Sequence, residues 1–310
     1  MTSGRTSAAT PATTPARRDV RRPRRRAWRR RAADYLAVVP FAIYIAVFLL
    51  WPTYIVLSGA FTDAHGRPTT ANMDTILGST YLAAFGRSVE LSAATALIGA
   101  VVGGLLAWAV VHGRPDGALR RVVVAASGVL AQFGGVTLAF AFIATVGFEG
   151  LVTVFFRDQL GVNLFAGGAW LFGMPGLILV YAYFQIPLMV IVFLPALDGL
   201  RREWREASES LGGTAWSYWR YVAGPILAPA FLGCVLLLFA NAFSSYATAA
   251  ALVSQGSPIV PLQIRGFLNG EVMLSQAGLG KALGLGMVVV VAVVMGLYAL
   301  LQRRTARWLR

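Results

Sequence analysis

The amino-acid sequence predicts an all-α integral membrane protein with six transmembrane helices and a charged helical elbow between the fourth and fifth. Three observations predict this class. Of the 310 residues, 57% are hydrophobic and only 13% are charged, with a mean hydropathy of +0.66, a balance that soluble domains do not tolerate. Several uncharged runs are long enough to cross a hydrocarbon layer of about 30 Å. The basic residues gather in the two tails and in every second connection between these runs, and this asymmetry predicts which side of the membrane each connection faces.

The apolar runs define the expected spans. The first run is too long for the core of a signal peptide, which has about 7–15 residues, so we expect an uncleaved first helix. Gly99 with Gly103, and Gly280 with Gly284, have the four-residue spacing that close helix packing favours. Allowing a few residues at each end, the expected spans are 35–60, 88–111, 122–147, 171–197, 226–252 and 279–301.

The chain divides into four parts. Residues 1–34 form a disordered, Arg-rich cytoplasmic tail, and residues 35–80 form the first transmembrane helix and an external loop. A core of five transmembrane helices follows over residues 81–301, and a basic cytoplasmic tail ends the chain over residues 302–310. We expect the N-terminal tail to contact anionic lipid, at about 1 kcal/mol per arginine. Nucleic-acid binding by this tail is the alternative, and we expect none.

The distribution of Lys and Arg predicts the orientation. Of the 27 such residues, 22 lie in the two tails, in the connection between the second and third spans, or in the connection between the fourth and fifth. The positive-inside rule places those segments in the cytoplasm. We therefore expect a multi-pass protein of a bacterial-type inner membrane with both termini and the elbow on the cytoplasmic side.

The elbow comprises residues 203–225, between the fourth and fifth spans. At a period of 3.6 residues, Trp204, Ala207, Ser208 and Leu211 share one face, and charged residues occupy the rest. Gly212 and Gly213 follow, and glycine adopts the positive φ that ends a helix. A structured, charged elbow on a membrane protein needs a partner or the membrane surface to lie against.

The elbow resembles the EAA signature of the permeases of binding-protein-dependent ABC importers. The matching positions are Glu206, Ala207, Ser208, Leu211, Gly212, Trp219, Val222 and Pro225. Ser208 and Gly213 stand where alanine is usual, and Gly224 stands where an aliphatic residue is common. The resemblance covers residues 81–300, which makes 81–301 the permease core. The alternative interpretation of the elbow is an ordinary cytoplasmic loop helix.

The resemblance implies a set of partners and a role for the elbow. In that family the elbow is a coupling helix that docks into a groove of an ATP-hydrolysing subunit. By this resemblance, Glu206, Ala207, Ser208, Leu211, Gly212 and Gly213 couple to the ATPase. The implied assembly has two cytoplasmic ATPase subunits that hold ATP-Mg, a second copy or a sister permease, and an extracytoplasmic solute-binding protein. The expected function is a transmembrane path for an imported solute.

Neutral polar residues within the spans are candidates for that path. They are Gln132, Gln185, Asn241, Ser244, Ser245 and Tyr246. The four residues between positions 241 and 246 concentrate donors and acceptors in one helix, which makes them the strongest candidates. Each of the six is equally consistent with a hydrogen bond between helices.

Several function classes are excluded by what the sequence lacks. Ionisable residues do not occur near the middle of any expected span, whereas ion-driven carriers commonly place them there. The energy for transport is therefore expected to come from a partner, and a secondary carrier that works without intramembrane charge is the alternative class. The lone Cys234 and two distant histidines, His65 and His112, suggest no metal site. We find no catalytic set, so the chain is expected to be neither an enzyme nor the carrier of a cofactor.

The nature of the solute is suggested only by the resemblance. Sugar permeases of the family tend to carry Ile-Asp-Gly within the signature, whereas Leu211-Gly212 is similar to the polyamine, ferric-iron, phosphonate and thiamine group. A sugar-type permease is the alternative. The segments 61–87, 148–170 and 253–280 face outward and combine turn formers with apolar patches. We expect them to include interfacial helices on which a binding protein docks; plain connecting loops are the alternative.

Overall fold

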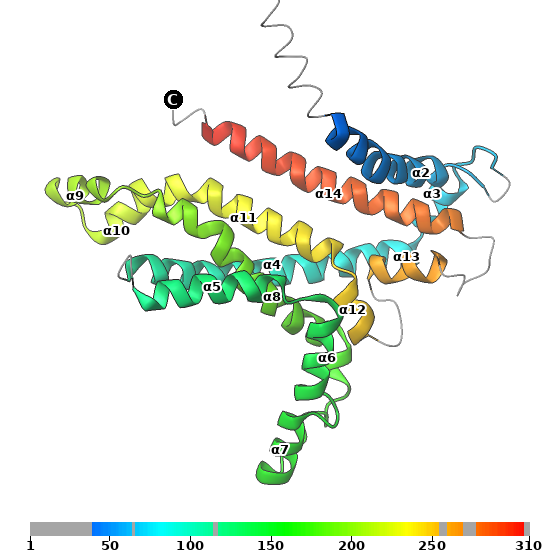
Figure 1. The fold of residues 1–310 in the computed structure, drawn as a ribbon, viewed down its shortest axis with the longest axis horizontal. Helices are drawn as coiled ribbons and strands as arrows, with labels where there is room; N and C mark the ends of the chain where they lie inside the picture. Colours follow the sequence, from blue (N-terminus) through cyan, green and yellow to red (C-terminus); the bar gives the residue numbers. More distant parts are fainter. Residues whose placement is uncertain (1–38, 64–65, 114–116, 254–258, 269–276, 307–310) are drawn as a thin grey trace, which may run out of the picture. The chain divides into compact units, whose positions relative to one another are not determined.

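The structure is a computed structural model that describes residues 39–63, 66–113, 117–253, 259–268 and 277–306, with side chains described except at residues 268, 277 and 301–306. The expected tail over residues 1–34 lies outside the described residues. Within the described ranges the regular elements are helices, apart from an isolated antiparallel bridge between Thr62 and Pro68. The all-α class is confirmed (Figure 1).

Six helical segments of the described chain are long and apolar enough to cross a membrane, as the sequence predicts. Their mean hydropathies lie between 2.0 and 2.5. At 1.5 Å per residue, each helical run except Gly135–Leu160 is longer than about 30 Å, and Gly135–Leu160 is interrupted between α6 (Gly135–Val146) and α7 (Leu151–Leu160). The six segments are Val39–Ala60, Ser79–His112, Gly135–Leu160, Met174–Asp198, Ala215–Ser244 and Gly278–Leu300.

The chain forms two compact units, residues 1–54 and 55–310. The described part of the first unit is helical from Val39 and contains the π-helical turn η1 (Ala46–Leu50), followed by the start of α2 (Trp51–Ala60). The backbone N–H of Trp51 bonds to the Ala46 carbonyl, five residues back. Pro52 explains this turn, because it lacks an N–H and its ring clashes with the carbonyl four residues before it.

The centre of the second unit is built from α4 (Ser79–His112), α8 (Met174–Asp198) and α11 (Gly224–Ser244). These three helices pack on one another, α4 most extensively against α8 (Figure 1). A Cβ added to Gly99 would lie 2.8 Å from the Gln185 Cβ, and one added to Gly103 would lie 2.5 Å from the Ile186 carbonyl oxygen. The predicted role of this glycine pair in close helix packing is confirmed.

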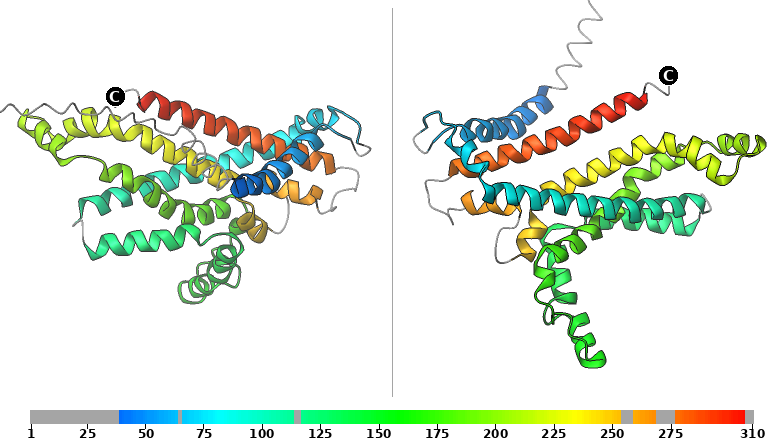
Figure 2. Two further views of the ribbon diagram at one scale, coloured as in Figure 1. Left: turned by 45° about the horizontal axis from the view of Figure 1, so that its top comes forward. Right: turned by 180° about the vertical axis from the view of Figure 1, so that it is seen from behind.

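The sixth span packs against this group of three helices, and shorter helices lie beyond the ends of the spans. The helix α14 (Ala277–Ala306) packs on α11 and α13, and Gly284 approaches Val56: an added Cβ there would lie 3.3 Å from the Val56 Cγ1. In each view, α6 (Gly135–Val146) and α7 (Leu151–Leu160) run away from the other helices of the second unit (Figure 2). The short helices beyond the ends of the spans include α3 (Ala71–Ile76), α12 (Ala247–Leu252) and α13 (Val260–Leu268).

The third candidate span, Gly135–Leu160, begins and ends 13 residues later than the predicted continuous helix over residues 122–147, and the predicted helix is broken. The chain forms α5 (Ala118–Gln132) and then α6 (Gly135–Val146), with a break at Phe133 and Gly134. Gly135 has φ +71°, which glycine adopts without steric cost, and its N–H donates to the Thr248 Oγ1 at 2.9 Å. The break is therefore stabilised by a residue far away in sequence.

The fifth span also differs at both ends from the expected range 226–252. It begins earlier, because α10 (Ala215–Tyr218) continues through the π-helical turn η3 (Trp219–Ala223) into α11. It ends earlier, because Ser245 is extended before α12 begins at Ala247. The turn η3 again precedes a proline, Pro225, just as η1 precedes Pro52.

Candidate functional site

The elbow is a capped helix held between two spans. After α8 ends at Asp198, only three residues lead to α9 (Arg202–Ser210). Arg201 is extended, with φ −76° and ψ 136°, so the chain turns sharply before the helix begins. Figure 2 shows α9 and α10 together at one end of α11. The elbow is thus attached to α8 by a short link.

The end of α9 is a Schellman motif. Gly212 has φ +79°, and its N–H donates to the Glu209 carbonyl at 3.0 Å. The Gly213 N–H donates to the Ser208 carbonyl at 2.9 Å, which completes the motif. The sequence predicted the glycine termination, although only Gly212 has the positive φ.

Gly213 is required for a different reason. A Cβ added at this position would lie 2.7 Å from both the carbonyl oxygen and the Oγ of Ser208. Real Cβ atoms do not approach oxygen so closely, so a side chain here would force α9 and the following chain apart. Ser208, at one of the signature positions, therefore lies directly against Gly213.

One face of α9 is apolar and borders a recess. The recess has a volume of about 460 Å³ and lies between α9 and the start of the fifth span. Leu211 is 89% exposed, so the recess has an apolar and accessible rim. The predicted shared face is confirmed by the residues that line the recess, which are Trp204, Ala207, Ser208, Leu211, Gly213, Val222 and Ile226.

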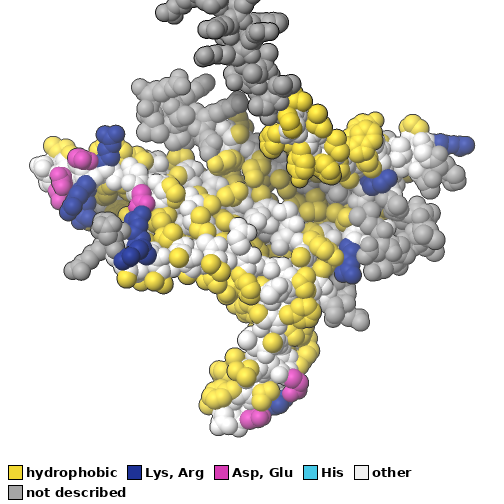
Figure 3. Space-filling view, viewed as in Figure 1, with side chains coloured by type: hydrophobic (Ala, Val, Ile, Leu, Met, Phe, Trp, Pro, Cys, Tyr) yellow, Lys and Arg dark blue, Asp and Glu magenta, His cyan; other side chains and the backbone are white. Residues whose placement is uncertain are grey.

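The opposite face of α9 carries charges in ion pairs within the helix. The Arg205 Nε lies 2.9 Å from the Glu209 Oε1, and the Arg202 Nε lies 3.7 Å from the Glu206 Oε1. Both pairs have the i, i+4 spacing that supports an exposed helix. Glu206 is 67% exposed, so its carboxylate remains accessible beside Arg202. Figure 3 shows these charges gathered at the end of the molecule where Figure 1 places α9.

The elbow continues into the fifth span without a flexible linker. Thr214 caps α10, because its Oγ1 accepts the Ser217 N–H at 3.3 Å. Tyr218 and Ala223 are buried, so the α10–η3 segment is packed rather than free. The segments α10, η3 and α11 therefore form one continuous helix, which α9 joins through residues 211–214, and α9 joins α8 through the short link.

A polar cluster lies deep in the α4–α8–α11 packing. Gln185 on α8 is fully buried, and its Nε2 donates to the Leu238 carbonyl on α11 at 2.7 Å. The Asn241 Nδ2 reaches the Gln185 Oε1 at 3.5 Å, a long hydrogen bond. The Tyr181 hydroxyl, one helical turn from Gln185, donates to the Ser245 carbonyl at 2.7 Å, where α11 ends. Buried amides need such partners.

The structure brings together some of the predicted path residues and separates others. Gln185 and Asn241 are in contact, whereas the Ser244 Oγ donates to the Ala240 carbonyl of its own helix at 2.9 Å. Gln132 is exposed at the end of α5. Ser245 and Tyr246 lie at the break between α11 and α12 instead of within a span.

A side-chain contact that the sequence analysis missed joins two spans near the elbow. Arg120 at the start of α5 and Asp198 at the end of α8 form a two-armed ion pair, with Nη1–Oδ1 and Nη2–Oδ2 distances of 3.1 and 2.5 Å. Paired guanidinium and carboxylate groups make strong, directional contacts. The sequence did contain a signal for this contact, because opposite charges lie at the ends of two spans that are expected on the same side of the membrane.

Replacing Gln185 with leucine tests the polar cluster. The variant removes the donor to the Leu238 carbonyl and the acceptor for Asn241, so we expect the free energy of unfolding to fall by about 1 kcal/mol. If the cluster borders the solute path, transport into proteoliposomes should fall more than stability predicts. Ser58, which is exposed on α2 and lies outside the proposed sites, changed to leucine, is the control. Equal transport by both variants would make the cluster purely structural.

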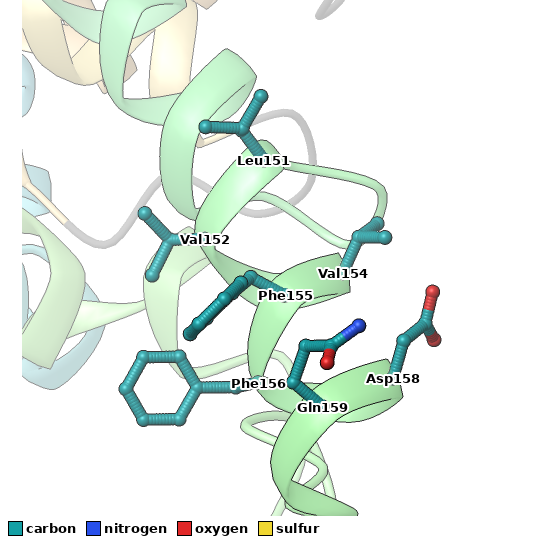
Figure 4. A pocket seen from close by; sticks show the side chains of 7 residues that line it. All are labelled: Leu151, Val152, Val154, Phe155, Phe156, Asp158 and Gln159. Atoms are coloured by element: carbon teal, nitrogen blue, oxygen red, sulfur yellow. The ribbon is translucent and has the colours of Figure 1, made fainter.

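The helix α7 has an apolar side and a polar side. Its apolar side chains include Leu151, which is 77% exposed, and Phe155, which is 57% exposed. Figure 4 shows Val152, Phe155 and Phe156 on one side and Asp158 on the other, around a recess of about 420 Å³. This arrangement suits a helix that lies at a membrane interface.

The chain matches a known family and several relatives. A family model described as the inner membrane component of binding-protein-dependent transport systems matches residues 98–307. A trehalose transport system permease protein of Mycobacterium tuberculosis is 24% identical over 283 residues, covering 88% of this chain and 94% of that protein. A probable sulfate transport system permease protein of Marchantia polymorpha is 25% identical, covering 72% of this chain and 75% of that protein.

A shorter match and a solved structure extend the comparison. The thiamine transport system permease protein of Escherichia coli is 30% identical over 81 residues, which is 26% of this chain and 15% of that protein. The crystal structure of a bacterial ABC transporter involved in alginate import contains a chain with a TM-score of 0.70 and 17% identity. That match covers 91% of this chain and 99% of the other, and it shows a shared fold.

Proposed function

Because this chain belongs to the family of inner membrane components of binding-protein-dependent transport systems, we propose that it is the permease subunit of an ATP-driven importer. As a member of that family it is a multi-pass inner membrane protein and is not itself an enzyme. The observation that carries the proposal of ATP coupling is the elbow: α9 ends in a glycine cap, is joined to α8 by three residues, and leads by four residues into the continuous α10–η3–α11 segment.

The elbow is proposed to receive mechanical work from two cytoplasmic ATPase subunits. ATP-Mg bound by those subunits would draw them together and displace α9. Because α9 is tied to α8 and α11, its displacement would tilt both helices and change which side of the membrane the solute path opens to. This mechanism needs no ionisable group inside the spans.

The docking surface is proposed to be the apolar face of α9 with its exposed rim. Leu211 is 89% exposed and would enter an apolar groove of the ATPase, with Ala207 and Ser208 allowing close approach. The Glu206 carboxylate, held beside Arg202 at 3.7 Å, would bond to polar groups at the groove's edge. Gly212 and Gly213 would fix the shape of the elbow.

The outer side is proposed to meet two further partners. A second permease subunit, identical or related, would complete the solute path, because α6 and α7 leave the packed helices of this chain (Figure 2). An extracytoplasmic solute-binding protein would dock on the side that holds α3, α7 and α13. The amphipathic character of α7 supports a position at that interface.

The cargo is proposed to be a small solute of the polyamine, iron, phosphonate or thiamine group. The Leu211-Gly212 signature supports that group, and the short match to a thiamine permease agrees with it. A sugar is the second candidate, because the trehalose permease matches over 88% of the chain. Uptake assays with each solute and its binding protein would decide between them.

Cysteine labelling tests the proposed orientation. The natural Cys234 is buried and is first replaced by serine. We expect Ser210→Cys, on exposed α9, to react in intact cells only with a membrane-permeant maleimide, and Gln159→Cys, on α7, to react also with an impermeant one. Labelling of residue 210 from outside would overturn the coupling role of the elbow.

Reconstitution tests the energy source. Proteoliposomes that contain the assembled transporter should accumulate solute only with the binding protein outside and ATP inside. Dissipation of ion gradients by an ionophore should leave this uptake unchanged. Uptake that continues without ATP but stops with the ionophore would favour a secondary carrier instead.

A further inference from the structure

The charged side of the elbow borders a second cavity, separate from the apolar recess. It has a volume of about 740 Å³ and is enclosed by the ends of α4, α5 and α8 together with α9 and α10. Tryptophan side chains from α4 and η3, Trp108 and Trp219, form part of its wall. The helix α9 therefore separates an apolar recess from this cavity.

The described lining of the cavity is rich in arginine. The arginines Arg120, Arg201, Arg202 and Arg205 line it, and Asp198 is the carboxylate among its lining residues. Both Asp198 oxygens are bonded to Arg120, so this carboxylate balances that arginine. Glu206 and Glu209 pair with Arg202 and Arg205 along α9 but do not line the cavity. Among the described lining residues, Arg201 forms no ion pair and lies over the Trp204 ring, so it leaves the cavity one positive charge in excess.

The chemistry of the lining residues favours one class of ligand. Guanidinium groups match the oxygens of a phosphate group with two parallel hydrogen bonds. Tryptophan is typical of the membrane–water interface, and basic cavities between transmembrane helices bind anionic lipid head groups. We propose that this cavity is a binding site for a phosphate-bearing anion, supplied either by an anionic phospholipid or by a soluble phosphate compound.

The site has a consequence for the elbow. The arginines of α9 and the ends of α4 and α5 would contact the same phosphate, so a bound anion would hold α9 against those helices. An occupied cavity would thus restrict the displacement that the proposed coupling requires. Only the cytoplasmic side of the site and this consequence rest on the proposed function; the binding itself does not.

Binding is measured on the purified full chain in nanodiscs. One arm compares phosphatidylcholine with and without phosphatidylglycerol and counts retained lipids by native mass spectrometry. The other titrates inorganic phosphate into phosphatidylcholine nanodiscs by calorimetry. The test variant is Arg201→Gln with Arg202→Gln. Arg220→Gln is the control with a matched change of residue type, because Arg220 lies over the Tyr221 ring and does not line the cavity.

The expected result is weaker anion binding by the test variant alone. At about fivefold per arginine, the double variant should bind about 25-fold more weakly, with the control within twofold of the original chain. Retention of phosphatidylglycerol would identify the lipid source, and binding of phosphate alone would identify the soluble one. If the double variant is unstable, Arg201→Gln should still show about a fivefold loss.

Two results would overturn the proposal. One is that neither anion binds the original chain, and the other is that the test and control variants bind alike. Neither readout uses ATP or another subunit, so loss of ATP-driven uptake would count against the proposed function without affecting this site. Labelling that places residue 210 outside would move the site to the other leaflet and leave its measured affinity unchanged.

Discussion

Replacing Gly212 with valine is expected to reduce ATP-driven uptake at least tenfold while the protein remains in the membrane. The residue has φ +79°, where a side chain costs about 1–2 kcal/mol and a β-branched one costs more. To escape that strain, the chain must give up the bond from the Gly213 N–H to the Ser208 carbonyl. The end of α9 would then unwind and no longer transmit displacement. Uptake and ATPase activity of the assembled transporter measure the effect.

Gly66 provides a control with the same backbone strain. It has φ +77°, nothing lies within 4 Å of an added Cβ, and it belongs to the segment expected outside. Gly66→Val should therefore leave coupling intact. Gly212→Asn should retain partial uptake, because asparagine tolerates the left-handed region better than valine. Normal uptake by Gly212→Val at a normal expression level would show that the shape of the elbow is not needed.

The elbow could be predicted from the sequence because its determinants are local. The apolar residues recur at helical spacing and two glycines follow, so a helix with a glycine end is the expected result. The two glycines nevertheless act differently. Gly212 provides the positive φ, whereas Gly213 makes room for Ser208, and the sequence does not distinguish these roles.

The breaks in the third and fifth spans could not be predicted, because their stabilising partners are distant in the chain. The Gly135 N–H donates to Thr248, 113 residues away, and the Ser245 carbonyl accepts from Tyr181, 64 residues away. A polar group freed at a break inside a membrane must find such a partner. The apolar pattern alone favours one long helix in both places.

The apolar pattern also does not predict which faces of the helices contact one another. In a soluble helix, the apolar side marks the core, but α8 is apolar on all sides. Leu177 is fully buried whereas Leu179, two residues later, is 45% exposed. Lipid and protein are both apolar surroundings, so hydrophobicity does not separate the two faces. The small residues of α4 do distinguish the two faces, because close packing against a neighbouring helix requires small residues and contact with lipid does not.

Replacing Gly103 with leucine should therefore prevent normal folding of the bundle. An added Cβ would lie 2.5 Å from the Ile186 carbonyl oxygen and 2.6 Å from the Met189 Cβ, and the backbone oxygen cannot move aside. Overpacking of this kind costs about 1–3 kcal/mol, and contact with backbone raises the cost. Because α4 and α8 form the most extensive contact among the described helices, their separation would also pull Gln185 away from Leu238.

The control for this substitution lies on the same helix. Gly86 is exposed, and nothing lies within 4 Å of an added Cβ, so Gly86→Leu should leave the membrane yield and the unfolding temperature unchanged. Gly103→Leu should lower both. If Gly103→Leu leaves the membrane yield and the unfolding temperature unchanged, as Gly86→Leu should, then leucine is tolerated where α4 meets α8. The close approach of these helices would then not be what sets the position of Gln185. The polar cluster would then need another support.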